Sequence, residues 1–184
     1  MTILAEYLKN GFDGPKDIIA QLIGLVPLAL SIFIFAQKSR KRIIFLKGCS
    51  DFLWAVHFFI LGEFSGGAIN AVNTVRSIVF AQREKKWAQH ILIPVAFCIF
   101  TVLCAVPGFQ GFYSLLPITG SVLAIIGFWQ NNVKLLRIFN LFGVTLWLIY
   151  GLWIVSVPTI ASNIFSICSI LTGLFREKRA EKTA

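Results

Sequence analysis

Two tryptophan–asparagine pairs are the residues of this sequence whose types and spacing best suit a binding site. Trp54 precedes Asn70 by sixteen positions, and Trp147 precedes Asn163 by the same interval. An asparagine amide offers hydrogen-bond donors and an acceptor, whereas a tryptophan offers a flat apolar face. This combination suits a sugar ring or another neutral polar metabolite. The sequence therefore predicts a substrate-binding role for these four residues, with interhelical hydrogen bonding and packing as the alternative.

Four further residues near these pairs are candidates for the lining of the same pocket. They are His57, Asn73, Tyr150 and Ser166. His57 follows Trp54 by about one helical turn. Its role is open between proton coupling and simple packing or hydrogen bonding.

Asp51 and Arg76 are charged residues inside apolar segments. Counted along the predicted helices, both lie about 9 to 12 Å from the same membrane face. An unpaired charge inside a membrane is costly, so we expect an intramembrane ion pair. Two alternatives stay open: Arg76 extends alone to the interface, or it binds an anionic group of the substrate.

The sequence contains no combination of residues typical of an enzyme site. It has no GxSxG motif, no HExxH motif, no phosphate-binding loop and no paired carboxylates at depth in the apolar segments. The four cysteines form no CxxC motif, which favours free thiols over metal ligands. We therefore predict no catalytic residues, no metal, no cofactor and no enzyme activity.

The composition indicates a membrane protein rather than a soluble domain. The chain is 57% hydrophobic, and its mean hydropathy is +0.80. Continuous apolar runs of roughly 20 residues predict helices that cross a bilayer. The net charge of +9 is expected to come from cytoplasmic loops, so we predict no nucleic-acid partner.

Seven transmembrane helices are predicted, and they must position the candidate residues. Their approximate ranges are 17–36, 43–61, 66–81, 87–106, 113–129, 135–155 and 158–175. Residues 1–16 form a polar lead without the apolar stretch of a signal peptide, so we expect the first span to be retained. The charged stretch from Arg176 onward is expected to be disordered.

The distribution of basic residues predicts the orientation. Lysines and arginines follow the first, third, fifth and seventh predicted helices, whereas the ends after the second, fourth and sixth carry none. Basic loops face the cytoplasm. The N-terminus is therefore predicted outside and the C-terminus in the cytoplasm.

An internal repeat relates the two halves of the chain. Shifting the numbering by 93 places Leu53–Lys85 on Leu146–Lys178 without a gap, and it superimposes the two tryptophan–asparagine pairs. We assign residues 17–86 to the first three-helix repeat, 87–107 to a linker helix, 112–178 to the second repeat and 179–184 to a cytoplasmic tail. Because one helix separates them, the repeats are predicted to be parallel, in a 3-1-3 all-α arrangement. Both pairs then share a level near the bilayer midplane.

The stretches VHFFILG (residues 56–62) and GGAINAVNTVR (residues 66–76) resemble the YgjV-type family of bacterial inner-membrane proteins. The predicted 3-1-3 repeat is similar to the SWEET and PQ-loop superfamily. The resemblance, which covers nearly the whole chain, implies that an aromatic residue of the second helix and an asparagine of the third line a sugar site. Trp54 with Asn70, and Trp147 with Asn163, match that pattern.

The sequence departs from the superfamily pattern at two features. The expected Pro-Gln pair reads Ala36-Gln37 and Trp129-Gln130, so only the glutamine is kept. The second and sixth predicted helices also lack a proline of the tetrad that gates SWEET transport. The resemblance therefore does not supply a hinge for gating.

We expect a small-solute transporter of the bacterial inner membrane that works by alternating access between the two repeats. The alternative is a non-transporting receptor or partner-binding protein on the same fold, which requires a centre filled by side chains. The expected partners are the lipid bilayer and a small-molecule solute. The sequence leaves open whether copies of the chain form a homo-oligomer.

Overall fold

The computed structural model describes residues 14–61, 64–109, 111–153 and 157–183, and within these ranges the protein is all-helical. Three short 3-10 helices, η1 (Lys86–Gln89), η2 (Val106–Gly108) and η3 (Phe112–Ser114), lie in the connections between the longer helices of these ranges. The α-helices of the described residues are α2 (Pro15–Ile34), α3 (Arg40–Leu61), α4 (Phe64–Ala81), α5 (Leu92–Ala105), α6 (Leu115–Trp129), α7 (Val133–Trp153) and α8 (Val157–Thr183).

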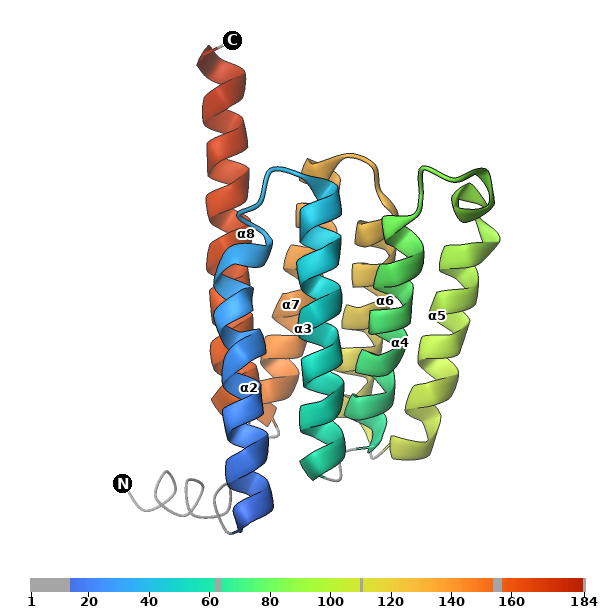
Figure 1. The fold of residues 1–184 in the computed structure, drawn as a ribbon, viewed down its shortest axis with the longest axis vertical. Helices are drawn as coiled ribbons and strands as arrows, with labels where there is room; N and C mark the ends of the chain where they lie inside the picture. The colour runs from blue at the N-terminus through green and yellow to red at the C-terminus, as the bar shows by residue number, and fades with distance from the viewer. Residues whose placement is uncertain (1–13, 62–63, 110, 154–156, 184) are drawn as a thin grey trace.

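Six of the helices form a closed ring. Helices α2, α4, α6 and α8 run upward in Figure 1, and α3, α5 and α7 run downward. Each ring helix packs against its neighbour in the order α2, α3, α4, α6, α7 and α8, and α8 packs back against α2. Helix α5 packs against α4 and α6 at the edge of the bundle (Figure 1). The ring therefore brings the first and second halves of the chain together around one centre.

The outer surface of the bundle is apolar. Within the described residues, four stretches are long and apolar enough to cross a membrane: Arg40–Ile60, Phe112–Trp129, Val133–Trp153 and Pro158–Arg179. The apolar stretches Ile18–Ile34 and Leu92–Gly108 are shorter. On α3, the outward-facing phenylalanines Phe45, Phe52 and Phe59 are exposed. Because they recur every two turns, they give one face of the helix an apolar stripe that suits contact with lipid.

Two predicted helix boundaries were wrong by more than a turn. The fourth helix was expected from residue 87, but η1 ends at Gln89, His90 is extended, and α5 begins at Leu92. This start places Pro94 in the first turn of α5, where its missing N–H breaks no helical hydrogen bond.

The prediction of a disordered charged tail was also wrong, because α8 continues to Thr183. Arginine, glutamate, lysine and alanine are strong helix formers, so the tail extends the helix that precedes it. Glu177 anchors the start of this extension by accepting a hydrogen bond of 2.9 Å from Arg137 Nη1.

Arg40, at the start of α3, ties together helix ends at the top of Figure 1, which we call the basic end because the lysine- and arginine-rich loops gather there. Its guanidinium donates to three backbone carbonyl oxygens, those of Phe128 (2.6 Å), Gln130 (2.8 Å) and Phe80 (3.4 Å). Cations are favourable at helix C-termini, where carbonyl groups lack helical partners. Arg40 therefore holds the ends of α4 and α6 against α3.

Arg137, on α7, makes the matching tie in the other half. It donates to the carbonyl oxygens of Phe35 (3.1 Å), Gln37 (2.8 Å) and Gly173 (3.2 Å). These acceptors are the positions that the 93-residue offset assigns to the three acceptors of Arg40. The two arginines thus connect each half of the chain to the other at the basic end.

Helices α6 and α7 meet at two glycines. A β-carbon added at Gly120 would lie 2.9 Å from the Gly143 carbonyl oxygen, and one added at Gly143 would lie 2.8 Å from the Gly120 carbonyl oxygen. The two backbones are therefore in direct contact, and neither position has room for a side chain without a shift.

We expect Gly143→Ala to lower the free energy of unfolding by about 1–3 kcal/mol, because the added methyl group forces α6 and α7 apart. Unfolding in a detergent series, followed by circular dichroism, measures the effect. Ser50→Ala is the control, because Ser50 is the position equivalent to Gly143 in the first half and already carries a side chain. Equal stability of the two variants would contradict the close contact.

Candidate functional site

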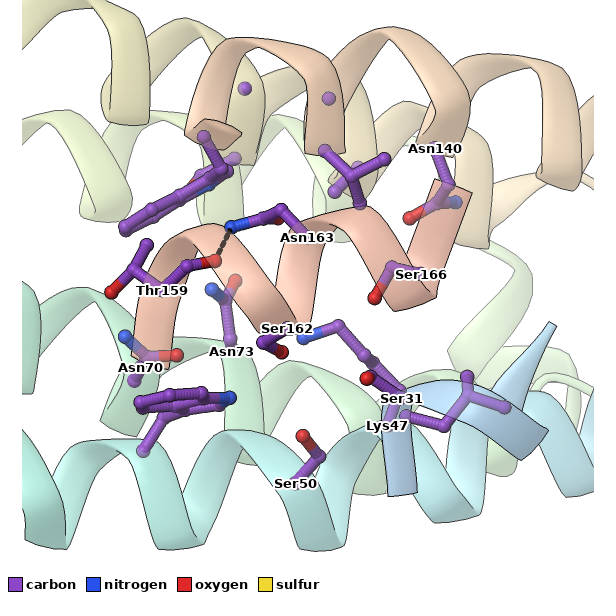
Figure 2. A pocket seen from close by; sticks show the side chains of 18 of the residues that line it. Ser31, Lys47, Ser50, Asn70, Asn73, Asn140, Thr159, Ser162, Asn163 and Ser166 are labelled. Carbon is purple, nitrogen blue, oxygen red and sulfur yellow. Dashed lines mark hydrogen bonds between the residues drawn. The ribbon is translucent and has the colours of Figure 1, made fainter. Parts of the chain in front are cut away.

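A cavity of about 80 Å³ lies inside the six-helix ring. Space of this size holds on the order of six water molecules. Figure 2 labels ten of the polar side chains around it. The lining residues that carry polar side chains are Ser31, Lys47, Ser50, Trp54, Asn70, Asn73, Arg76, Ser121, Asn140, Trp147, Thr159, Ser162, Asn163 and Ser166.

Helical periodicity explains why polar side chains line the cavity although the bundle surface is apolar. On α3, Lys47, Ser50 and Trp54 lie three and four positions apart, so they share one face of the helix. The exposed phenylalanines of α3 lie on other faces of the same helix. In lipid, polar side chains are placed toward the interior of a bundle, where they find partners.

The structure brings the four predicted substrate-binding residues together at this cavity. Trp54, Asn70, Trp147 and Asn163 all line it. Asn70 Nδ2 donates to the Gly66 carbonyl oxygen at 2.8 Å. Asn163 Nδ2 makes the equivalent bond of 2.8 Å to the Thr159 carbonyl oxygen, drawn as a dashed line in Figure 2. Each bond fixes the rotamer of the amide and leaves its carbonyl oxygen available to a ligand.

The four predicted lining residues divide into two groups. Asn73 and Ser166 line the cavity, whereas His57 and Tyr150 lie outside the lining. His57 is buried, and its Nδ1 lies 2.8 Å from the Ala20 carbonyl oxygen of α2.

Each of these two outlying residues packs against a cavity tryptophan. The His57 ring meets Trp54 edge to face at 5.0 Å between centroids, and Tyr150 meets Trp147 in the same way at 5.8 Å. Such contacts restrict the orientation of both indoles. His57 and Tyr150 therefore pack against the tryptophans without lining the cavity themselves.

A group of three charges lies on the first-half wall of the cavity. Arg76 Nη2 lies 3.3 Å from Asp51 Oδ2, and Lys47 Nζ pairs with Asp51 Oδ1. Asp51 is fully buried, and the Arg76 side chain is 1% exposed. Arg76 also donates to Asn73 Oδ1 at 3.0 Å, and its guanidinium carbon lies 4.7 Å from the centre of the Phe128 ring. The aspartate is thus held between two cations.

The sequence analysis missed several cavity residues, and two of them, Lys47 and Asn140, could have been found from their spacing. Lys47 and Asn140 both line the cavity (Figure 2). They are equivalent under the 93-residue offset, and each precedes its tryptophan, Trp54 or Trp147, by seven positions. This spacing of two helical turns is a signal that the sequence does contain, because residues seven apart share a helix face.

Comparison with known proteins places the chain among membrane proteins. Residues 18–181 match a family described as bacterial inner membrane protein, Imp-YgjV. The chain is similar to the inner membrane protein YgjV of Escherichia coli (strain K12), with 25% identity over 140 residues that cover 73% of this chain and 71% of the relative. No solved structure matches the chain.

Proposed function

Because this chain belongs to the YgjV family and is a bacterial inner membrane protein, we propose that it is a small-solute carrier of that membrane. It is not an enzyme in this proposal. The solute is a polar metabolite that binds among Trp54, Asn70, Trp147 and Asn163. All seven α-helices cross the bilayer, with the basic end in the cytoplasm.

The observation that carries the proposal is the cavity inside the six-helix ring. It takes lining residues from three helices of each half, and each half contributes a tryptophan and an asparagine at equivalent positions. Carriers built from structural repeats bind substrate where the repeats meet near the bilayer midplane. A non-transporting protein on this fold would instead be expected to fill its centre with side chains. The cavity therefore supports the carrier.

Matched contacts in the two halves support the parallel-repeat arrangement. Helices α2 to α4 and α6 to α8 follow the same sequence of directions in Figure 1. Gln37 Nε2 donates to the Phe33 carbonyl oxygen at 3.3 Å, and Gln130 Nε2 donates to the equivalent Ile126 carbonyl oxygen at 3.2 Å. In this proposal each half rocks as a unit against the other, with α5 as the linker. Access to the cavity alternates by this motion, and the arginine ties must part when the basic end opens.

We expect the double variant Asn70→Ala with Asn163→Ala to reduce solute uptake by about tenfold or more, because two hydrogen bonds to the solute are lost. The assay uses purified protein in liposomes and a panel of radiolabelled sugars, polyols and small organic acids. Asn131→Ala, which removes an exposed amide from the loop between α6 and α7, is the matched control. Unchanged uptake of an identified solute by the double variant would refute the site assignment.

A further inference from the structure

The charges on the cavity wall do not balance. Within the described part of the chain, Lys47 and Arg76 are the charged residues that line the cavity, and Asp51 lies behind them with its side chain fully buried. Two cations and one carboxylate leave one positive charge in excess. An uncompensated charge within a membrane protein is costly and marks a functional site by default.

The excess charge belongs to one half of the molecule only. Under the 93-residue offset, the positions equivalent to Lys47, Asp51 and Arg76 hold the neutral residues Asn140, Val144 and Ser169. Asn140 uses its Nδ2 on the Leu136 carbonyl oxygen, at 2.8 Å. The second half therefore cannot cancel the charge. A ligand in the cavity meets a cationic wall on one side and amides and hydroxyls on the other.

Lys47, rather than Arg76, has hydrogen-bond donors to spare. Arg76 is nearly fully buried and is engaged by Asp51, Asn73 and Ser77, with Ser77 Oγ at 3.5 Å from Nη2. The Lys47 ammonium has three N–H donors. Among the described residues it has one partner, Asp51, and the Lys47 side chain is 22% exposed. Lys47 is thus the cation that faces a ligand, and Arg76 holds Asp51 in place.

We propose that the solute of this cavity is a small monocarboxylate whose carboxylate pairs with Lys47. A single negative charge neutralises the wall, whereas a dianion would leave a negative excess and a neutral solute would leave the positive one. A cavity of about 80 Å³ suits a small solute. The cavity amides and hydroxyls take its remaining polar group. This proposal rests on the carrier function above, and it specifies the class of solute.

Binding to the full-length protein in lipid nanodiscs tests the proposal. The probes are lactate, its neutral isostere lactamide, and the dianion malonate, and the readout is tryptophan fluorescence, since Trp54 and Trp147 line the cavity. We expect lactate to bind at least about tenfold more tightly than either other probe, as a charge-assisted hydrogen bond allows. Lys47→Asn installs the residue of the second half and leaves the Asp51–Arg76 pair intact. It should abolish the preference for lactate.

Two further variants separate charge from folding. Lys47→Arg keeps the charge and should keep the preference, and Lys38→Asn removes an equally charged but exposed loop residue and should change nothing. If lactamide binds as tightly as lactate and Lys47→Asn changes neither affinity, the solute is not a monocarboxylate. This result would not contradict the carrier function. Lysine-dependent lactate binding without uptake into liposomes would support this site and overturn transport. Binding of neither probe would overturn the inference, while the asparagine variants still test the carrier with sugars and polyols.

Discussion

Asp51→Val is expected to destabilise the protein by about 3–5 kcal/mol, because it leaves Arg76 buried without its counter-ion. Arg76 is 1% exposed, and its remaining partners, Asn73 and Ser77, are neutral. Lys47 also loses its carboxylate, so two cations then face each other across the interface of α3 and α4. Valine is the residue that the second half carries at the equivalent position, Val144.

Replacing all three charges should restore most of the stability. We expect the triple variant Lys47→Asn, Asp51→Val, Arg76→Met to lie much closer to wild type than Asp51→Val alone, since neutral residues of similar volume often substitute for a buried ion pair. Methionine keeps an unbranched stem to pack on Phe128. Detergent unfolding of the single and triple variants measures the difference. If the triple variant is no more stable than Asp51→Val, the three charges are not coupled as described.

Arg137→Met is expected to lower the free energy of unfolding by about 3 kcal/mol or more, because it removes a cationic donor shared by three backbone carbonyl groups and Glu177. The loss should be local. Backbone hydrogen exchange should speed up in the loop that follows α2, which supplies the Phe35 and Gln37 acceptors. The corresponding variant Arg40→Met should instead loosen the loop that follows α6, where Gln130 accepts from Arg40.

Hydrogen exchange with mass spectrometry distinguishes the two arginine ties. Arg42→Met is the control, because it removes an exposed basic residue from the same end of the molecule. Each arginine variant should speed exchange only in the loop that supplies its own acceptors. If either variant loosens both loops, the basic end moves as one body. No change in either loop would show that the ties contribute little.

The helices and the tryptophan–asparagine pairs were predictable from the sequence because their signals are local or periodic. A run of about 20 apolar residues specifies a helix wherever it lies in the chain. The 93-residue offset predicts equivalent positions for Asn70 and Asn163, and both residues line the cavity. The two helix boundaries that were predicted wrongly also have local causes. Pro94 lies in the first turn of α5, and helix-forming residues continue α8 to Thr183. The apolar pattern alone contains neither signal.

The partners of the arginines were not predictable in the same way. Arg40 and Arg137 count as cytoplasmic-loop charges by composition, yet their guanidinium groups bind carbonyl oxygens about 90 to 100 positions away in the chain. A backbone carbonyl has no residue-type signature, so no sequence pattern marks it as an acceptor. The same limit applies to His57, whose partner is the Ala20 carbonyl oxygen on another helix.

By itself, the sequence determined that this chain forms apolar helices, that its basic residues gather at one end, and that two halves carry equivalent aromatic and amide residues. Only the tertiary structure decided which faces meet: it closes six helices into a ring, leaves a cavity there, and turns Lys47 toward that cavity while His57 packs against α2. The physical reason is that apolarity and charge act through position along one helix, whereas a cavity and its unbalanced charge arise from the packing of several helices against each other.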